Sequence, residues 1–277
     1  MTDKYAVIGN PIAHSKSPQI HAAFAKQTNQ DISYEAILAP LDGFEAKVRE
    51  LIKQGYKGAN VTVPFKFKAL LFAAQRGAIN PLADKARAVN TLIFEDESII
   101  GDNTDGVGLV SDIEHNLGFP IQGKRILLLG AGGAAFGVLQ PLANAKPSNI
   151  VISNRTISKA EEAAKILSNL VDTSGGTLCV AKPFDQLGDE AFDLVINSTS
   201  TGLTDTKLPI PDSVFKKNGL AYDMMYGRET PFMAQARAAG AQVSDGLGML
   251  VEQAAEAFYI WRDVRPETAP VIAMLRN

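Results

Sequence analysis

The chain has 277 residues, of which 46% are hydrophobic and 21% are charged, and its formal net charge is -3. This length fits one large domain or two ordinary ones with a packed core. The lack of a basic block argues against nucleic acid or an anionic membrane as a partner, and no apolar run approaches the length of a membrane span. The N-terminus predicts no secretory leader, and the one cysteine, Cys179, cannot form an internal disulfide. We therefore expect a protein of the reducing cytoplasm.

Strands and helices alternate along the first half of the chain, which predicts an α/β unit. The expected strands span 5–9, 34–38, 58–63 and two stretches of 89–103, separated by a polar turn at Glu95–Ser98. The expected helices span 18–27, 44–53, a segment from Lys66 onward, and 106–117 with Gly118 at its end.

The pattern changes after the Gly- and Pro-containing segment 118–124. Residues 125–129, RILLL, form a continuous apolar run, which is typical of a strand buried on both faces. Further strands are expected at 149–154, around 180–181, at 192–197 and at 220–225, and helices after residue 130, at 158–170 and at 249–261. Ser158 and Glu161 have the spacing of a capping box. This half predicts a doubly wound parallel sheet, with the boundary between the halves near residue 105.

The sequence GAGGAA, residues 130–135, follows the RILLL strand and opens a helix, as a dinucleotide-binding loop does. In this pattern Gly130 allows the tight turn, Gly132 lets a pyrophosphate approach the backbone, and Ala135 lets helix and strand pack closely. The helix N-terminus then favours the phosphates. We therefore expect a dinucleotide site here; a purely structural glycine turn is the alternative.

The end of the next strand indicates which dinucleotide is bound. An NAD site usually carries an Asp or Glu there, which bonds the ribose 2′-hydroxyl, whereas this chain has Asn154, Arg155, Thr156 and then Lys159. A guanidinium matches a 2′-phosphate and can stack on adenine. The expected cofactor is therefore NADP, although Arg155 could also be an exposed turn residue.

Lys66 is an unexpected residue at the start of its helix. Val61 and Val63 alternate as in a buried strand, Pro64 should end that strand and occupy the first helical position, and Lys66 follows. A helix N-terminus favours Asp or Glu in its first turn. Lys66 is therefore either solvated or present because a ligand needs its ammonium group.

Other polar residues of the first half gather at strand ends and helix starts. Ser17 fits an N-cap with Pro18 at the first helical position, but this does not explain Ser15. Asp105 could cap the helix at 106. The remaining members of this polar set are Thr62, Asn90 and Gln253.

These hydroxyl, amide, ammonium and carboxylate groups suit a small polyhydroxylated carboxylic acid. His14, His21 and His115 are scattered and show no metal-ligand spacing; His14 beside the serines could be a ligand, but a surface or capping role is favoured. The sequence contains no G-x-S-x-G elbow, and its one cysteine lacks an obvious base.

Taken together, these residues resemble the shikimate dehydrogenase family, enzymes of aromatic amino-acid biosynthesis. The resemblance covers nearly the whole chain in order: GNPIAHSKSP, GANVTVPFK, AVNTL, GDNTDG, GAGGA, NRT, YDM and DGLGMLVEQAA. It implies the reversible reduction of 3-dehydroshikimate to shikimate with NADPH, without a metal. It also implies two α/β domains with a cleft between them: a substrate-binding domain, 1–104 plus 247–277, and a Rossmann-type NADP-binding domain, 105–246. Monomer and homodimer are both compatible with it.

The resemblance also implies roles for individual residues. Lys66 and Asp105 match the catalytic pair, with Lys66 as general acid/base and Asp105 positioning it and the substrate. Residues matching substrate ligands are Ser15, Ser17, Thr62, Lys66, Asn90, Asp105, Tyr226 and Gln253. Residues matching cofactor ligands are Gly130, Ala131, Gly132, Gly133, Ala134, Asn154, Arg155, Thr156, Lys159, Thr199, Met224 and Gly246.

Two positions depart from the family pattern. Phe136 stands where many relatives carry a polar or basic residue. Lys159 stands where an arginine is common, and a lysine, unlike an arginine, cannot make a bidentate phosphate contact.

Three other functions are compatible with parts of the sequence. A quinate/shikimate dehydrogenase with relaxed NAD or NADP use is opposed by the serine pair and Arg155. A non-catalytic NADP-binding regulator is expected to lose Lys66 or Asp105, and both are present. An unrelated small-molecule binder would make the glycine loop and the NRT turn coincidental.

Overall fold

The computed structural model describes residues 2–95, 98–170, 177–188, 190–204 and 206–277. They divide into two compact units, Met1–Gly108 with Leu250–Asn277, and Leu109–Met249. The chain passes between the units inside two helices, α5 (Asp105–Ser111) and α9 (Leu247–Arg262). Both boundaries lie a few residues beyond those expected from the sequence. A membrane span would need a longer and more apolar helix than any in the described part of the chain.

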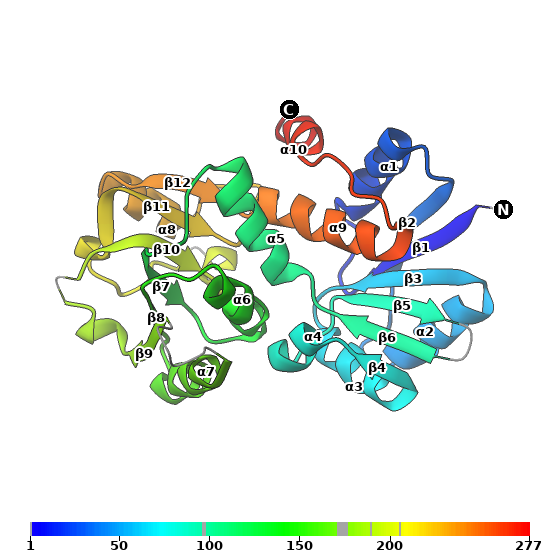
Figure 1. Cartoon of the computed structure of the whole chain (residues 1–277), viewed down its shortest axis with the longest axis horizontal. Helices are drawn as coiled ribbons and strands as arrows, with labels where there is room; N and C mark the ends of the chain where they lie inside the picture. The colour runs from blue at the N-terminus through cyan, green and yellow to red at the C-terminus, as the bar shows by residue number, and fades with distance from the viewer. Residues whose placement is uncertain (1, 96–97, 171–176, 189, 205) are drawn as a thin grey trace. The chain divides into compact units, whose positions relative to one another are not determined.

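The unit built from both ends of the chain contains a mixed six-stranded sheet (Figure 1). Its strands are β1 (Asp3–Gly9), β2 (Ile32–Leu38), β3 (Tyr56–Val61), β4 (Gly77–Ile79), β5 (Thr91–Glu95) and β6 (Ser98–Asp102), in the order β2-β1-β3-β5-β6-β4. Strand β1 is parallel to β2 and β3, whereas β5 is antiparallel to both β3 and β6. Its helices, besides parts of α5 and α9, are α1 (Ser17–Thr28), α2 (Phe44–Lys53), α3 (Lys66–Arg76), α4 (Pro81–Ala86) and α10 (Ala269–Arg276).

Side-chain alternation along β1 divides the core of this unit between the two faces of the sheet. Ala6 and Ile8 are fully buried and pack into a cluster with residues of α2 and α3. Tyr5 points the other way and stacks on Trp261 of α9, with ring centroids 4.7 Å apart. Helices α1 and α9 therefore cover one face and α2 and α3 cover the other (Figure 1).

The second unit holds a six-stranded sheet in which all neighbouring strands are parallel. Its strands are β7 (Arg125–Leu129), β8 (Asn149–Ser153), β9 (Leu178–Lys182), β10 (Phe192–Asn197), β11 (Phe215–Asp223) and β12 (Gln242–Asp245), in the order β12-β11-β10-β7-β8-β9. Counted from β7, this is the Rossmann order 3-2-1-4-5-6. Its helices, besides parts of α5 and α9, are α6 (Gly133–Asn144), α7 (Ile157–Leu170) and α8 (Pro231–Ala238). The expected doubly wound parallel sheet is confirmed.

The RILLL strand is buried on both faces, as predicted. Ile126 and Leu128 belong to the cluster with α6 and α7, whereas Leu127 and Leu129 belong to the cluster with α8, and all four are fully buried. Ala135 is also fully buried against this sheet, so helix α6 packs closely on it.

Several local expectations differ from the structure. Strand β3 ends at Val61 and α3 begins at Lys66, so Val63 is 64% exposed and Pro64 precedes the helix instead of opening it. Helix α7 begins at Ile157, which places Ser158 inside the helix and rules out the proposed capping box. The helix expected at 106–117 is α5 followed by a wider π-helical turn, Asp112–Asn116.

Among the described residues, the short elements that were not predicted include β4, α4, α8 and β12. The turn expected at Glu95–Ser98 falls partly on residues 96–97, outside the described residues.

Candidate functional site

The polar residues of the mixed-sheet unit converge because of its topology. Strands β1 and β3 are parallel, so the segments that follow them, with Ser15, Ser17, Thr62 and Lys66, leave the same edge of the sheet. Strand β5 runs antiparallel to β3 and therefore starts at that edge, just after Asn90. Strand β6 in turn ends there, shortly before Asp105.

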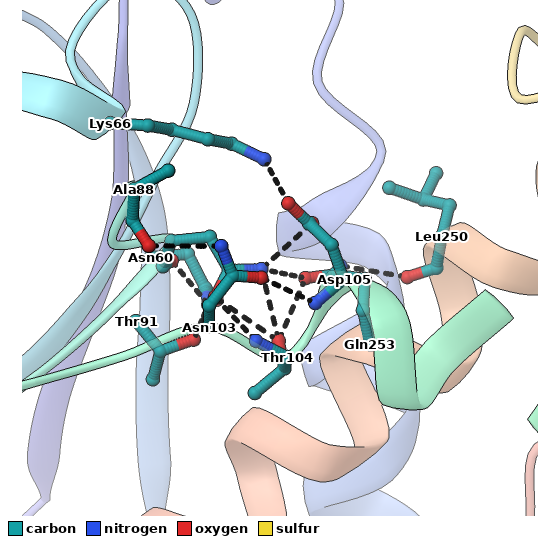
Figure 2. Close-up of polar contacts among 10 residues, drawn as sticks. Asn60, Lys66, Ala88, Thr91, Asn103, Thr104, Asp105, Leu250 and Gln253 are labelled. Atoms are coloured by element: carbon teal, nitrogen blue, oxygen red, sulfur yellow. Dashed lines mark hydrogen bonds and ion pairs between the residues drawn. The ribbon is translucent and has the colours of Figure 1, made fainter. Parts of the chain in front are cut away.

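Lys66 and Asp105 form an ion pair, with Lys66 Nζ 2.5 Å from Asp105 Oδ2 (Figure 2). Each is the first residue of its helix, α3 and α5. The side chain of Lys66 is 28% exposed and that of Asp105 is 12% exposed, so the pair is partly buried but accessible to a ligand. Such a pair can hold a proton donor next to a small ligand.

Asn90 connects this pair to the rest of the site. It is 2% exposed, and its Nδ2 donates to Asp105 Oδ1 at 2.8 Å. Both Asp105 carboxylate oxygens therefore accept hydrogen bonds from other side chains. Because both oxygens have these partners, Asp105 does not serve only as a helix cap.

Gln253 from α9 completes the cluster in Figure 2. Its Nε2 donates to the Leu250 carbonyl at 2.8 Å, which leaves Oε1 facing Asn90 Nδ2 at 3.4 Å. Gln253 therefore has two partners, the Asn90 amide and a backbone carbonyl.

The serine segment differs from expectation in one detail. Helix α1 begins at Ser17 with Lys16 at the N-cap position, and no side chain caps it. Ser17 is therefore the first helical residue, and the predicted N-cap role is wrong. The backbone N–H of Ser17 donates to Ser15 Oγ at 3.3 Å, which orders the two serines relative to each other.

A cavity of about 440 Å³ lies within the parallel-sheet unit, around the glycine loop. Ten of the predicted cofactor residues line it: Gly130, Ala131, Gly132, Gly133, Ala134, Asn154, Arg155, Thr156, Lys159 and Thr199. Gly130 has φ +105°, the left-handed conformation that favours glycine. A Cβ on Gly132, in contrast, would meet nothing within 4 Å, so the backbone there is open to a ligand.

The charge of this cavity suits a phosphorylated ribose. Arg155 and Lys159 line the cavity and are exposed, and no acidic residue ends β8. The turn after β8 is held by Asn154 Nδ2, which donates to the Thr156 carbonyl at 2.9 Å. A third cation, exposed Lys207, lines the cavity from a separate segment.

NADP therefore fits these residues: open glycine backbone at a helix N-terminus for the pyrophosphate, and cations without a ribose-binding acid for the 2′-phosphate.

Three other predicted residues lie in the parallel-sheet unit but do not line this cavity. Met224 and Gly246 follow the neighbouring strands β11 and β12, and the Gly246 N–H donates to the Met225 carbonyl at 2.9 Å. Tyr226 follows Met225, and burial raises the pKa of its phenol.

Several residues of both sites were not predicted from the sequence. In the cavity these are Phe184, Ser198, Ser200, Thr201, Thr206, Lys207, Leu208 and Pro209. The run of hydroxyl residues after β10 was a usable signal. Around Asn90 the missed residues are Asn60, Thr91, Asn103 and Thr104. Asn60, a polar residue in an apolar strand, was a signal too, because such a group needs a partner.

Comparisons with known proteins agree on one family. Its models match in three segments, described as shikimate dehydrogenase substrate binding domain (7–92), shikimate / quinate 5-dehydrogenase (113–204) and shikimate 5'-dehydrogenase C-terminal domain (246–276). A shikimate dehydrogenase (NADP(+)) of Methylobacillus flagellatus is 59% identical, covering 99% of both chains. One from Dechloromonas aromatica is 54% identical over 100% of this chain and 98% of its own.

Solved structures share the fold. A shikimate 5-dehydrogenase from Thermus thermophilus, in complex with NADP(H) and shikimate, has a TM-score of 0.86 at 30% identity, covering 99% of both chains. A 5-ketofructose reductase of Gluconobacter has a TM-score of 0.85 at 27% identity, covering 100% of this chain and 99% of its own. Enzymes named for different substrates therefore have this fold.

Proposed function

This chain belongs to the shikimate dehydrogenase family, and from that premise we propose that it is an NADP-dependent shikimate dehydrogenase. It catalyses the reversible reduction of 3-dehydroshikimate to shikimate, an oxidoreduction at a CH–OH carbon. The observation that carries the proposal is the Lys66–Asp105 pair, held by Asn90 at the sheet edge that also bears the serine pair.

The mixed-sheet unit binds the substrate in this proposal. Ser15 and Ser17 donate hydroxyl hydrogen bonds to the substrate carboxylate. Thr62, Asn90 and Gln253 bind the ring substituents. Asn90 and Gln253 already order each other, so the amides need little rearrangement when a ligand arrives. We assign Tyr226 to the substrate as well.

Lys66 and Asp105 manage the proton. NADPH, when bound, supplies the hydride. The ketone oxygen gains negative charge as it is reduced, and the Lys66 ammonium group donates the proton that this oxygen needs. Asp105 holds Lys66 at 2.5 Å and positions the hydroxyl of the product. In the oxidative direction neutral Lys66 accepts that proton.

The parallel-sheet unit binds the cofactor. The backbone of Gly130–Ala134 and the N-terminus of α6 hold the pyrophosphate. Asn154, Arg155, Thr156 and Lys159 would hold the 2′-phosphate. Thr199, Met224 and Gly246 would border the nicotinamide.

We assign the enzyme to the cytoplasm, where its half-buried Cys179 stays a thiol. A monomer or a homodimer is the expected assembly, and light scattering distinguishes them.

The test is reduced-cofactor absorbance in a grid of substrates and cofactors: shikimate or quinate with NADP⁺ or NAD⁺, and 5-ketofructose with NADPH. Fast turnover with shikimate and NADP⁺ alone supports the proposal. Comparable turnover with quinate or NAD⁺ assigns the chain to the relaxed branch, and turnover of 5-ketofructose alone assigns it another substrate. Binding of NADP⁺ without turnover in any well would contradict the roles of Lys66 and Asp105.

A further inference from the structure

Thr91, the first residue of β5, has no role in the proposal above. It is fully buried, and its hydroxyl makes two side-chain hydrogen bonds (Figure 2). The hydroxyl accepts from Asn60 Nδ2 at 3.1 Å and donates to Asn90 Oδ1 at 2.8 Å. A buried hydroxyl with both functions engaged has one orientation available to it.

Backbone groups fix the direction of these hydrogen bonds. The Thr104 backbone N–H donates to Asn90 Oδ1 at 2.9 Å, and because an N–H can only donate, the other end of this amide, Nδ2, faces Asp105. At Asn60, Nδ2 also donates to the Asn90 carbonyl at 3.2 Å, and a carbonyl can only accept. Asn60 Oδ1 then accepts from the Tyr34 hydroxyl at 2.7 Å.

The result is a one-way series of hydrogen bonds, from Tyr34 through Asn60, Thr91 and Asn90 to Asp105. Its far end is held rigidly, because the Tyr34 ring stacks on fully buried His21 with centroids 4.0 Å apart and planes 7° apart. Asn60, Thr91 and Asn90 are at most 6% exposed, so water does not replace these bonds.

We propose that Thr91 is a positioning residue whose hydroxyl holds the Asn90 amide against Asp105, and thereby keeps the carboxylate directed at Lys66. The inference rests on the catalytic roles proposed above. Without the hydroxyl, Asn90 Oδ1 keeps only the Thr104 contacts, and Asn60 Nδ2 loses one acceptor. The Asn90 side chain then gains freedom to rotate away from the geometry that catalysis needs.

The test compares Thr91→Val, which has nearly the same shape without the hydroxyl, with Thr91→Ser, which keeps the hydroxyl. We expect Thr91→Val to lower kcat for shikimate oxidation about 10-fold with the KM for NADP⁺ unchanged, and Thr91→Ser to recover most of the loss. Thr28→Val is the matched control, since it removes a threonine hydroxyl that donates to the Phe24 carbonyl at 2.7 Å in α1. Thermal unfolding is measured for every variant.

A double-mutant cycle separates positioning from a merely structural role. If Thr91 acts through Asn90, adding Thr91→Val to Asn90→Ala changes kcat by less than about 2-fold. An equal loss in both backgrounds would overturn the inference, as would a fully active Thr91→Val. Absence of shikimate turnover in the unaltered protein would instead refute the proposed function, so the two failures are distinguishable.

Discussion

The ammonium nitrogen of Lys66 lies 2.5 Å from an oxygen of Asp105, and the two residues begin two different helices. The partial positive charge of a helix N-terminus stabilises Asp105 and disfavours Lys66, by about 0.3–1 kcal/mol for an exposed group. The Asp105 carboxylate offsets this effect for Lys66. Lysine at this position therefore serves the site and not the helix.

Replacing Lys66 by alanine is expected to lower kcat by about 100- to 10,000-fold, the usual contribution of a general acid or base, with little change in the KM for shikimate. Lys68→Ala is the control, because Lys68 lies on the same helix and its Nζ donates to the Leu41 carbonyl instead. Steady-state kinetics with NADP⁺ in excess measures both. A large rise in KM with kcat intact would make Lys66 a binding residue.

Arg155→Ala is expected to raise the KM for NADP⁺ about 10- to 100-fold, because charge-assisted hydrogen bonds to a phosphate are lost. The KM for NAD⁺, which lacks the 2′-phosphate, should barely change. Arg237→Ala removes an exposed arginine that pairs with Glu229 in the same unit and serves as the control. Equal losses for both cofactors would disprove recognition of the 2′-phosphate by Arg155.

Lys207→Ala tests the third cation of the nucleotide cavity. Since Lys207 is exposed, we expect a smaller effect, about a 3- to 10-fold rise in the KM for NADP⁺ that shrinks at high salt. Lys217→Ala, at another exposed lysine of the unit, is the control. An unchanged KM at low salt would exclude Lys207 from the phosphate site, whereas an equal rise for NAD⁺ would assign it to the pyrophosphate.

Two alanine substitutions in the glycine loop should affect different properties: Gly130→Ala the stability of the protein, and Gly132→Ala its binding of NADP⁺. At Gly130 the φ of +105° and a Cβ contact of 2.5 Å with Ser198 Oγ predict destabilisation by about 1–3 kcal/mol. At Gly132 the φ of -99° is ordinary and the Cβ meets nothing, so stability should be kept while NADP⁺ binding weakens. Thermal unfolding without ligand and NADP⁺ titration measure the two effects. A stable Gly130→Ala, or a Gly132→Ala with unaltered NADP⁺ affinity, would contradict this account of the loop.

Burial raises the pKa of the Cys179 thiol to about 12. The thiolate is the reactive form, so labelling of the native protein at pH 8 should be on the order of 1000-fold slower than that of an ordinary thiol. As long as the pH stays below that pKa, the labelling rate should increase about tenfold for each unit by which the pH is raised. A chromogenic disulfide reagent follows the reaction, and urea provides the unfolded reference. Native labelling as fast as in urea would show that Cys179 is accessible and ionised.

The nucleotide site is the part most readily predicted from the sequence. The glycine loop and the Asn154–Thr156 turn each follow a strand directly, so a short window of sequence contains both the residues and their structural setting. Lys207 escapes such reasoning because it lies outside any helix or strand and reaches the cavity only through the tertiary fold.

The residues around Asp105 are less predictable, because their partnerships depend on strand pairing. Asn60 and Thr91 are far apart in sequence but directly opposite each other in the antiparallel register of β3 and β5. No local pattern encodes that register, and only the family resemblance pointed to Lys66 and Asp105 as a pair. Helix starts were also imprecise: Ser17 and Ser158 have the chemistry of N-caps, yet each lies inside its helix.

The division of the chain has a consequence for the order of folding during synthesis. Leu109–Met249 forms one compact unit from a continuous segment, whereas the other unit needs Leu250–Asn277 as well as the first 108 residues. Val251, Ala254, Ala255 and Phe258 of α9 pack with Ile20 and Phe24 of α1, so this core is incomplete until the last helices are made. Although domains usually fold from the N-terminus onward on the ribosome, here the middle of the chain can finish first, and the unit with Lys66 and Asp105 is completed last.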